Sequence, residues 1–428
     1  MLVLASVVGL AAGSVRGADV QQELQDLRQA NTALQAQLRE QRGVIELLSK
    51  QMAQVQQTQA ALDLRAGNNA PPASASGIDL GRIHLSGEAG VGFFHSGKEG
   101  ITPNSEFRVD EAKLFFEAPV WKNVYAFGEL NLAAHEGGDL SLNVGELYLD
   151  VEDVSQLWGR ERQLNVRAGR LDVPFGEEYL RRDAIDNVLI SHSLADFWGV
   201  DEGVEIYGTL GKFSYVVAVQ NGGDPAVRDF TGDKSVTARL GFDPTRWLHL
   251  SVSGMRTGEI DVQNEYISAI WFGGGWFAPV GSFATTTRFH ANMVQGDVRL
   301  KWQRGHLAAS GGYICYDDND TAGSNHRGIY HYAIEAQQNL TPKLYVAERF
   351  SQIVADKGYL LTGNGNMGDY FNPSNLTKDL WRLSLGLGYR FGDNLLVKSE
   401  YTFEGGRAVS GAGRDHEDLF ALEAAVKF

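Results

Sequence analysis

The sequence predicts an all-β protein: a 16-stranded antiparallel transmembrane β-barrel preceded by an α-helical coiled coil. Three observations support this prediction. Segments with alternating apolar and polar residues recur along most of the chain, and their connections alternate between short and long. A stretch near the N-terminus carries heptads in place of alternation. Charged residues recur on the second face of the alternating segments, which would be the outside of a soluble sandwich or the lumen of a membrane barrel.

Composition excludes several classes of protein. The chain has 428 residues with 50 glycines and only 10 prolines, which suits many twisted strands joined by tight turns. A net charge of −15 argues against nucleic acid as a partner, because a nucleic-acid backbone requires a basic surface. The single cysteine, Cys315, cannot form an internal disulfide. Beyond the N-terminus no run of apolar residues is long enough for a helical membrane span, a test that does not apply to barrels.

Residues 1–18 are predicted to form a secretory signal peptide. Residues 1–12 are apolar, small residues follow, and Val15 and Gly17 stand at suitable −3 and −1 positions for cleavage. The basic start typical of such peptides is missing, because the first basic residue is Arg16. The alternative interpretation is a buried strand or a short anchor helix.

Residues 19–65 are predicted to form a coiled coil, and residues 66–80 a linker. Residues 19–65 are rich in glutamine and free of proline, whereas the linker is rich in alanine, proline, serine and glycine. The alternative is a single amphipathic helix lying on the barrel. The predicted core positions fall at alternating steps of three and four: Leu24, Leu27, Asn31, Leu34, Leu38, Gln41, Ile45, Leu48, Met52, Val55, Gln59 and Leu62.

Residues 81–428 are predicted to form the barrel. Short turns are expected at 119–121, 211, 244–246, 304, 341 and 392–393, with long connections between them, as in bacterial outer-membrane barrels. The last strand ends on Phe428, and terminal aromatics of this kind resemble the assembly signal of such barrels. The predicted strands are 82–95, 107–118, 122–133, 140–150, 162–170, 201–210, 212–221, 234–243, 247–256, 290–302, 305–316, 328–339, 342–354, 379–391, 394–405 and 416–428.

Alternation stops in the connection 171–200, which joins the fifth and sixth predicted strands and is therefore the third outer loop. Pro174 and Gly176 break the strand pattern, and carboxylates mingle with arginines after them. We expect this loop to fold into the barrel and narrow it. The candidate constriction residues are Arg167, Arg170, Glu177, Glu178, Arg181, Arg182, Asp183 and Asp186.

The predicted inward faces carry charges of both signs. Acidic residues such as Glu88, Glu129, Asp297, Glu335 and Glu400 accompany the cations, which indicates a weakly selective channel with a transverse field. The candidate lumen cations are Arg239, Arg299, Lys301, Arg382, Arg390 and Lys398.

The region 160–221 resembles the phosphate-selective porin O and P family. The resemblance implies a trimer of sixteen-stranded barrels that passes small hydrophilic solutes, in some members with a preference for anions. The coiled coil is not general to that family but is similar to envelope-spanning extensions on some outer-membrane porins. The residues that carry the resemblance are Arg167, Gly169, Arg170, Pro174, Phe175, Gly176, Glu177, Arg181, Arg182 and Gly203.

Several candidate residues have a structural interpretation as well. Arg181 and Arg182 either contact solutes or form ion pairs that hold the loop, and His192 suits a loop hydrogen-bonder better than a metal ligand. Asp317, Asp318, Asn319 and Asp320 offer oxygens for calcium, but a solvated loop explains them better and their spacing does not match an EF-hand. The aromatic stretch 271–277 suits either a trimer interface or an interfacial girdle.

The functional hypothesis is therefore a porin of the bacterial outer membrane, with the N-terminal extension in the periplasm. The expected partners are the lipid bilayer, two further copies in a homotrimer, and peptidoglycan or another cell-wall polymer through the coiled coil. A structural tether with a closed pore is the alternative. An enzyme is not expected, because the GxSxG and HExxH motifs are missing, and the sequence indicates no cofactor and no metal.

Overall fold

The computed structural model describes residues 78–80, 82–100, 102–133, 142–194, 196–197, 199–222, 229, 231–261, 288–317, 326–357, 377–408 and 411–428. The chain divides into two compact units, Met1–Pro71 and Pro72–Phe428, and every described residue belongs to the second. The predicted signal peptide and coiled coil, the aromatic stretch 271–277 and Asp318, Asn319 and Asp320 lie outside the described residues and stay predictions.

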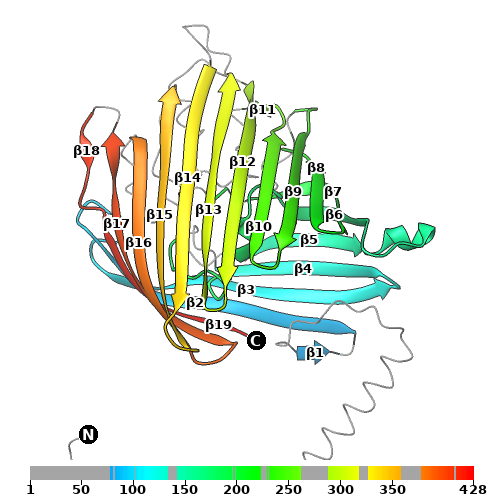
Figure 1. Ribbon diagram of the computed structural model, residues 1–428, viewed down its shortest axis with the longest axis horizontal. Helices are drawn as coiled ribbons and strands as arrows, with labels where there is room; N and C mark the ends of the chain where they lie inside the picture. The colour runs from blue at the N-terminus through cyan, green and yellow to red at the C-terminus, as the bar shows by residue number, and fades with distance from the viewer. Residues whose placement is uncertain are drawn as a thin grey trace, which may run out of the picture. The chain divides into compact units, whose positions relative to one another are not determined.

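Sixteen long strands form a closed antiparallel β-barrel, as the sequence predicts (Figure 1). Three short strands, β1 (Ile78–Leu80), β11 (Ile260–Asp261) and β18 (Gly413–Arg414), pair at its ends. The long strands are β2 (Ile83–Ser96), β3 (Glu106–Trp121), β4 (Val124–Ala133), β5 (Asn143–Val151), β6 (Asn165–Asp172), β7 (Val200–Leu210), β8 (Phe213–Gln220), β9 (Ser235–Thr245), β10 (Leu248–Arg256), β12 (Arg288–Trp302), β13 (Gly305–Asp317), β14 (His326–Asn339), β15 (Leu344–Lys357), β16 (Thr377–Arg390), β17 (Leu395–Ala408) and β19 (Leu419–Lys427).

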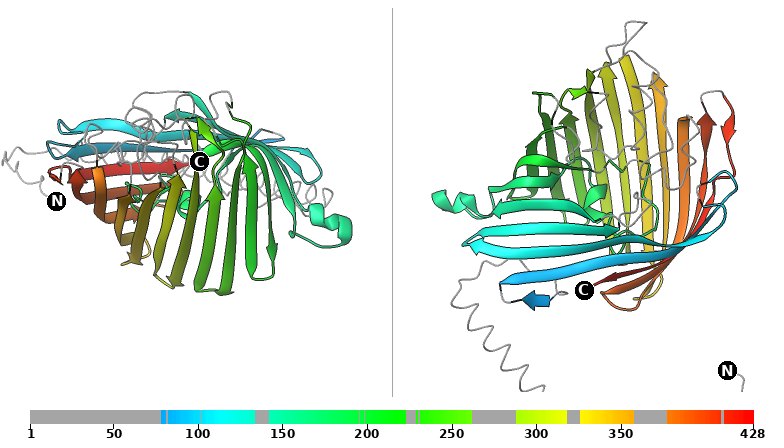
Figure 2. Two further views of the ribbon diagram at one scale, coloured as in Figure 1. Left: turned by 90° about the horizontal axis from the view of Figure 1, so that it is seen from above. Right: turned by 180° about the vertical axis from the view of Figure 1, so that it is seen from behind.

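The first and last long strands close the barrel. β19 pairs antiparallel with β2, in a register that runs from Leu419 opposite Ser96 to Lys427 opposite Glu88. Backbone hydrogen bonds between Phe428 and Gly87 continue this pairing to the C-terminus. Figure 2 shows how the sheet curves round to bring these two strands together. Closure pairs the first and last long strands with each other, which is the condition for a sheet that lacks water on its outer side.

The side chains are arranged in the opposite way to those of a soluble protein. On β16, Leu385 and Leu387 are 42% and 49% exposed on the outer face, whereas Arg382 and Ser384 are buried on the inner face. The same division holds on β19, where Phe420, Leu422 and Val426 are exposed. Alternation in the sequence therefore places apolar side chains outside and polar side chains inside.

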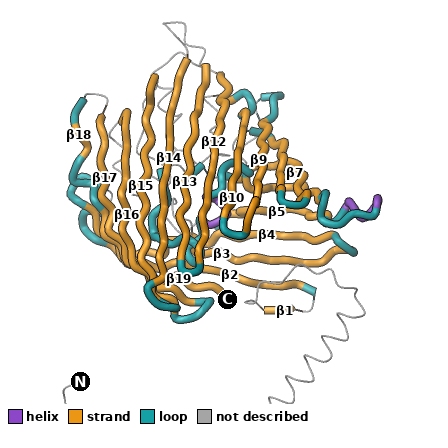
Figure 3. Tube along the Cα trace, in the orientation of Figure 1, coloured by secondary structure: helices purple, strands orange, loops and turns teal. Residues whose placement is uncertain are grey.

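The connections at the turn end are short, with one exception. The connection 152–164 between β5 and β6 contains a 3-10 helix, η1 (Val154–Trp158), which projects beyond β5 (Figure 3). Gly159 ends η1 in the left-handed conformation, and Ser155 is buried beneath the turn. Because this turn takes up residues 152–164, β6 begins at Asn165, later than the predicted strand start at 162. No helix in the described part of the chain has the length and apolar character needed to cross a membrane.

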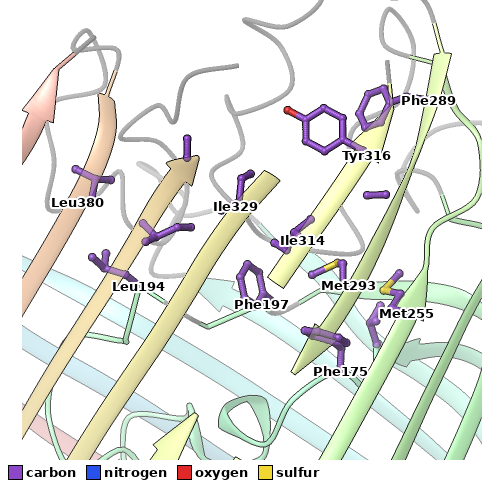
Figure 4. Packing of buried hydrophobic residues seen from close by; sticks show 14 of the residues in the cluster. Phe175, Leu194, Phe197, Met255, Phe289, Met293, Ile314, Tyr316, Ile329 and Leu380 are labelled. Carbon is purple, nitrogen blue, oxygen red and sulfur yellow. The ribbon is translucent and has the colours of Figure 1, made fainter. Parts of the chain in front are cut away.

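We call residues 173–199 the β6–β7 segment, and its described residues, which leave out 195 and 198, pack against the inner face of the barrel. The segment contains a second 3-10 helix, η2 (Glu178–Arg181). Its Phe175, Leu194 and Phe197 lie in one buried apolar cluster with inward-facing residues of the strands (Figure 4). The strand members of this cluster are Phe94, Met255, Phe289, Ala291, Met293, Ile314, Tyr316, Ile329, Ile353, Ala355, Leu380, Leu419 and Ala421.

Candidate functional site

The β6–β7 segment begins where the sequence breaks the strand. Gly176 has a φ of 72°, and a Cβ placed there would lie 2.6 Å from Nε2 of Gln295 on β12, so the segment requires glycine at this point. A second cluster of buried residues secures the middle of the segment, where Ile185, Val188 and Leu189 pack on Tyr345 and Leu396 of the wall. Apolar burial therefore fixes the segment at both ends and in the middle.

Cations of the barrel wall hydrogen-bond to backbone carbonyls of the segment. A buried loop must find partners for its own peptide groups, and inward-facing Lys and Arg side chains supply them here. The bonds run from Arg239 to Gly176 (2.7 Å), from Lys398 to Ala184 (2.7 Å) and Leu189 (2.8 Å), from Arg390 to Ile185 (3.4 Å), from Arg349 to Ser191 (2.7 Å) and from Arg382 to His192 (2.8 Å).

Acceptors of the wall satisfy the backbone N–H groups of the same segment. Glu400 accepts hydrogen bonds from the N–H groups of Ile190 and Ser191, and Glu111 accepts one from Ala184. Hydroxyl oxygens do the same at the two ends, where Ser253 accepts from Gly176 and Ser351 accepts from Leu194. The barrel wall and the segment thus complete each other's hydrogen bonds.

Three carboxylates meet at the junction of the segment with β2 and β3. Glu88, Glu111 and Asp183 place oxygens within 4.8 Å of one another, close enough to share a cation. The ammonium group of Lys113 lies among them, 2.5 Å from Asp183 and 3.6 and 3.7 Å from the two glutamates. Burial raises the pKa of the Asp183 carboxyl, but Lys113, Arg182 and a hydrogen bond with Glu88 together outweigh burial, so the pKa lies below its ordinary value. Lys113 therefore supplies the counter-charge that a metal ion would otherwise provide.

A cavity lies between the segment and the wall formed by β10 and β12–β15. Its lining mixes charges, with Glu177, Glu178 and Asp186 on the segment and Asp297 and Glu335 on the strands. The cationic side chains of the lining are Arg181, Arg182, Arg299 and Arg349. Such a lining offers both donors and acceptors to a hydrated solute.

Two of the predicted constriction residues lie on β6, and the structure separates them. Arg167 faces inward and contacts Asp150 (2.8 Å) and Glu205 (3.4 Å). Arg170 is opposite Leu147 and Glu202 in the register, and Leu147 is exposed on the outer face. Arg170 therefore lies on the outer face, and its assignment to the constriction is wrong. Positions three apart on a strand cannot share a face.

The remaining constriction candidates divide between cavity and anchor. Glu177 lies between Arg239, His249 and Arg299 at 3.3–3.5 Å, and Arg181 reaches Glu335 on β14 at 3.3 Å. Asp186 is exposed and lines the cavity. Buried Arg182 contacts His192 (3.1 Å) and Asp196 (3.4 Å) within the segment, and Glu178 accepts hydrogen bonds from Ser193.

All six predicted lumen cations lie on the inner face, but most of them are engaged. Arg239, Arg382, Arg390 and Lys398 hold the segment, as described above. Buried Lys398 also pairs with Glu423 (2.8 Å), and buried Arg382 pairs with Glu404 (2.7 Å). Arg299 contacts Glu177, and Lys301 is exposed near the turn end of β12. Lys301 and, in part, Arg299 are thus the candidates that remain for a solute.

Sequence reasoning did not single out two residues that carry much of this network. Arg349 donates to Ser191 and to the side chain of Asn187 and also contacts Glu335, and Lys113 binds Asp183. Alternation could have placed both on the inner face, because Lys113 shares its face with Glu111 and Arg349 shares its face with Ser351. Their partners in the segment follow only from the tertiary structure.

The described barrel superimposes on several solved outer-membrane channels. It is similar to the outer membrane channel DcaP of Acinetobacter baumannii, with a TM-score of 0.53 and 14% identity over 82% of this chain and 100% of that one. OmpT, an outer membrane protein of Vibrio cholerae, gives a TM-score of 0.54 and 11% identity over 83% and 100%. An anion-selective porin from Comamonas acidovorans gives 0.51 and 10% over 81% and 98%. The barrel has the porin fold.

At these identities the likeness shows the fold alone. No protein-family model matches the chain, and no curated protein matches it.

Proposed function

We propose that this protein is an outer-membrane porin through which small hydrophilic solutes and ions diffuse passively. The observation that carries the proposal is the reversed wall: a closed barrel with exposed Leu, Val and aromatic side chains outside and charged side chains inside. An apolar outer surface of this extent suits lipid, and a polar interior suits water.

The route we infer passes beside the β6–β7 segment, along the cavity that Arg181, Asp186 and Arg299 line. The inner faces of β3–β7 carry an excess of carboxylates, whereas those of β9–β16 carry the larger number of cations. Solutes in transit would therefore cross a transverse field, in which opposite charges are drawn to opposite walls.

Conductance of the purified protein in planar bilayers tests the proposal. We expect ohmic steps whose reversal potential in a salt gradient reports the selectivity. Protein that inserts into the bilayer but conducts no current, in preparations where a known porin conducts, would contradict it. Any preference for anions should be weak, because four of the six lumen cations hold the segment.

A trimer is the assembly we propose. The heptads at 19–65 suit a parallel three-stranded coiled coil that would match three barrels, and the name of one solved neighbour, OmpT of Vibrio cholerae, specifies a trimer form. Steps that open and close in groups of three would support this assembly, and cross-linking that stops at two copies would contradict it.

A tether to the cell wall is the second candidate function, favoured by the same heptads in what we propose is a periplasmic extension. A continuous helix over residues 19–65 would lengthen by about 1.5 Å per residue. We propose that its length is enough to reach a cell-wall polymer. Co-sedimentation of the purified full chain with isolated sacculi tests this function. Binding without conductance would favour the tether over the porin, and conductance without binding would favour the porin alone.

A further inference from the structure

Aromatic side chains form a ladder across the inner face of consecutive strands from β3 to β7. The ring centroids of Phe115 and Phe127 lie 6.1 Å apart, and those of Phe127 and Tyr148 lie 5.0 Å apart, both pairs with planes at 26°. The guanidinium of Arg167 continues the ladder, 5.1 Å from the ring of Tyr148 and 4.3 Å from that of Tyr207. We call these five residues the aromatic ladder.

The ladder faces the lumen and is partly exposed. Tyr148 stands between Leu147 and Leu149, which are exposed on the outer face, so its own side chain points inward. Phe127 is opposite Tyr148 in the register and shares that face. None of the ladder residues is fully buried. The inner wall of a water-filled barrel is usually polar, so partly exposed rings in this position need an explanation beyond the packing of the sheet.

Carboxylates alternate with the rings. Glu117 is directly opposite Phe127, Glu129 is directly opposite Phe115, and Glu146 precedes Tyr148 on the same face of β5. Within the described residues none of the three glutamates forms an ion pair. Each of the three rings Phe115, Phe127 and Tyr148 therefore has a carboxyl group beside it on the same face.

The wall already binds one organic cation, which belongs to the chain itself. Arg167 places its guanidinium beside the rings of Tyr148 and Tyr207 and contacts Asp150 (2.8 Å) and Glu205 (3.4 Å). Two rings and two carboxylates thus surround one guanidinium group. The same two kinds of group recur on β3, β4 and β5.

We propose that the aromatic ladder, with Glu117, Glu129 and Glu146, is a binding track for organic cations. The solutes it fits join an ammonium or guanidinium group to a flat apolar or aromatic body. The carboxylates attract the charge, and the rings add cation–π and apolar contacts that a small inorganic cation does not match. The proposal rests on the proposed pore, because a solute reaches this wall only through the lumen.

A solute with charges of both signs would be oriented by the barrel as it passes. Its cationic group would face β3–β7, and its carboxylate would face Arg299 and Lys301 on β12 across the lumen. An anion without a cationic group gains nothing from the track.

The test measures block of single channels of the full-length protein by benzyltrimethylammonium. Tetramethylammonium carries the same charge without the ring, and benzenesulfonate carries the ring with the opposite charge. We expect benzyltrimethylammonium to bind about two- to tenfold more tightly than tetramethylammonium, the range of one aromatic pair, because both ions carry the ammonium group and only the first carries a ring. Benzenesulfonate should not block through this wall. Equal affinities for the two ammonium ions would overturn the proposal.

Three variants localise the binding. Phe127→Leu removes a ring while keeping an apolar side chain, and Glu117→Gln and Glu129→Gln remove charge with almost no change in volume. Each should weaken block by benzyltrimethylammonium at least about twofold, and Phe127→Leu should abolish the advantage over tetramethylammonium. Glu348→Gln is the matched control, because Glu348 is exposed on the outer face of β15 and should leave block unchanged. Track variants that bind as the wild type does would overturn the proposal.

Calorimetric titration of the detergent-solubilised protein with benzyltrimethylammonium separates the track from the pore. Binding that depends on Phe127, in a protein that conducts no current, would contradict the proposed porin function and support the track. Normal conductance with neither block nor binding would contradict the track and support the porin function.

Discussion

Arg181 and Arg182 are neighbours in sequence, but they have different surroundings in the β6–β7 segment. Arg181 is partly exposed in the cavity and makes one contact with the wall, to Glu335 at 3.3 Å. Arg182 is buried against His192 and Asp196. The first is placed to act on a solute and the second to hold the fold of the segment.

Replacing Arg181 with Gln should lower the anion-to-cation permeability ratio, because a unit charge about 4 Å from a passing ion contributes about 1 kcal/mol in water, or about fivefold. Reversal potentials in a salt gradient measure the change. Arg182→Gln should leave the ratio nearly unchanged and instead increase current noise by loosening the segment. An unaltered ratio in Arg181→Gln would assign Arg181 to the scaffold.

The stability that Asp183 contributes to the folded protein depends on pH. Its pKa lies below the ordinary value because Lys113, Arg182 and a hydrogen bond with Glu88 together outweigh burial. Folding therefore gains stability from this group at all pH above the ordinary Asp pKa of about 3.9. That stability is lost as the pH falls through the lowered pKa of the folded protein.

We therefore expect the difference in urea midpoint between wild type and Asp183→Asn to be constant from pH 7 to pH 5 and to shrink below about pH 4. Unfolding in detergent, followed by tryptophan fluorescence, measures the midpoints. A difference that already shrinks between pH 7 and pH 5 would mean that the pKa of Asp183 is not lowered.

At the scale of the element, the described residues of the β6–β7 segment form no regular secondary structure apart from η2. Its position depends on inserted apolar side chains and on peptide groups paired with the wall. Leu194 is 1% exposed in the apolar cluster that Figure 4 shows, whereas Leu180 of the same segment is 53% exposed. These two leucines make a matched pair for a test.

Leu194→Ala should destabilise the packed segment by about 2–5 kcal/mol, because it leaves a cavity in a close-packed cluster. Leu180→Ala should cost much less. Protease cleavage within the segment of the folded protein, together with open-channel noise, measures the loosening. Equal behaviour of the two variants would show that the cluster does not hold the segment.

At the scale of the whole molecule, the barrel requires different surroundings on its two faces. Val252 of β10 is 50% exposed on the outer face, and its neighbours Ser251 and Ser253 are buried on the inner face. If lipid covers the outer face, a charge there is costly in a way that depends on its depth in the bilayer.

Val252→Arg should destabilise the membrane-embedded barrel by about 2–4 kcal/mol if the site lies near the bilayer midplane, whereas Val252→Leu should have little effect. Folding yield into vesicles and the urea midpoint of the embedded protein measure this. If the arginine variant folds as well as the wild type, and the protein stays monomeric without detergent, the membrane assignment fails.

Much of the architecture could be predicted, because alternation depends only on the two-residue period of a strand. The sixteen strands, their approximate bounds and the two faces follow from residues such as Leu385 and Arg382. Arg170 was assigned to the wrong face because the assignment followed its closeness to the loop instead of its parity with Arg167. The long turn at 152–164 could not be predicted from the alternation pattern. Its shape depends on the left-handed conformation of Asp153 and Gly159 and on the hydrogen bond from the Gln163 N–H to the hydroxyl of Ser155.

The sequence by itself determined the barrel. Alternation along each strand shows which side chains avoid water, and a sheet whose outer face is apolar must pair its first strand with its last. Only the tertiary structure decided what the inward charges do. The sequence does not indicate which groups Lys398 and Arg382 bind. In the structure, their side chains donate hydrogen bonds to carbonyls of a segment about two hundred residues away. The physical reason is that a buried carbonyl accepts a hydrogen bond from a donor that lies close to it in space. The separation of the two residues along the sequence does not indicate how close they lie.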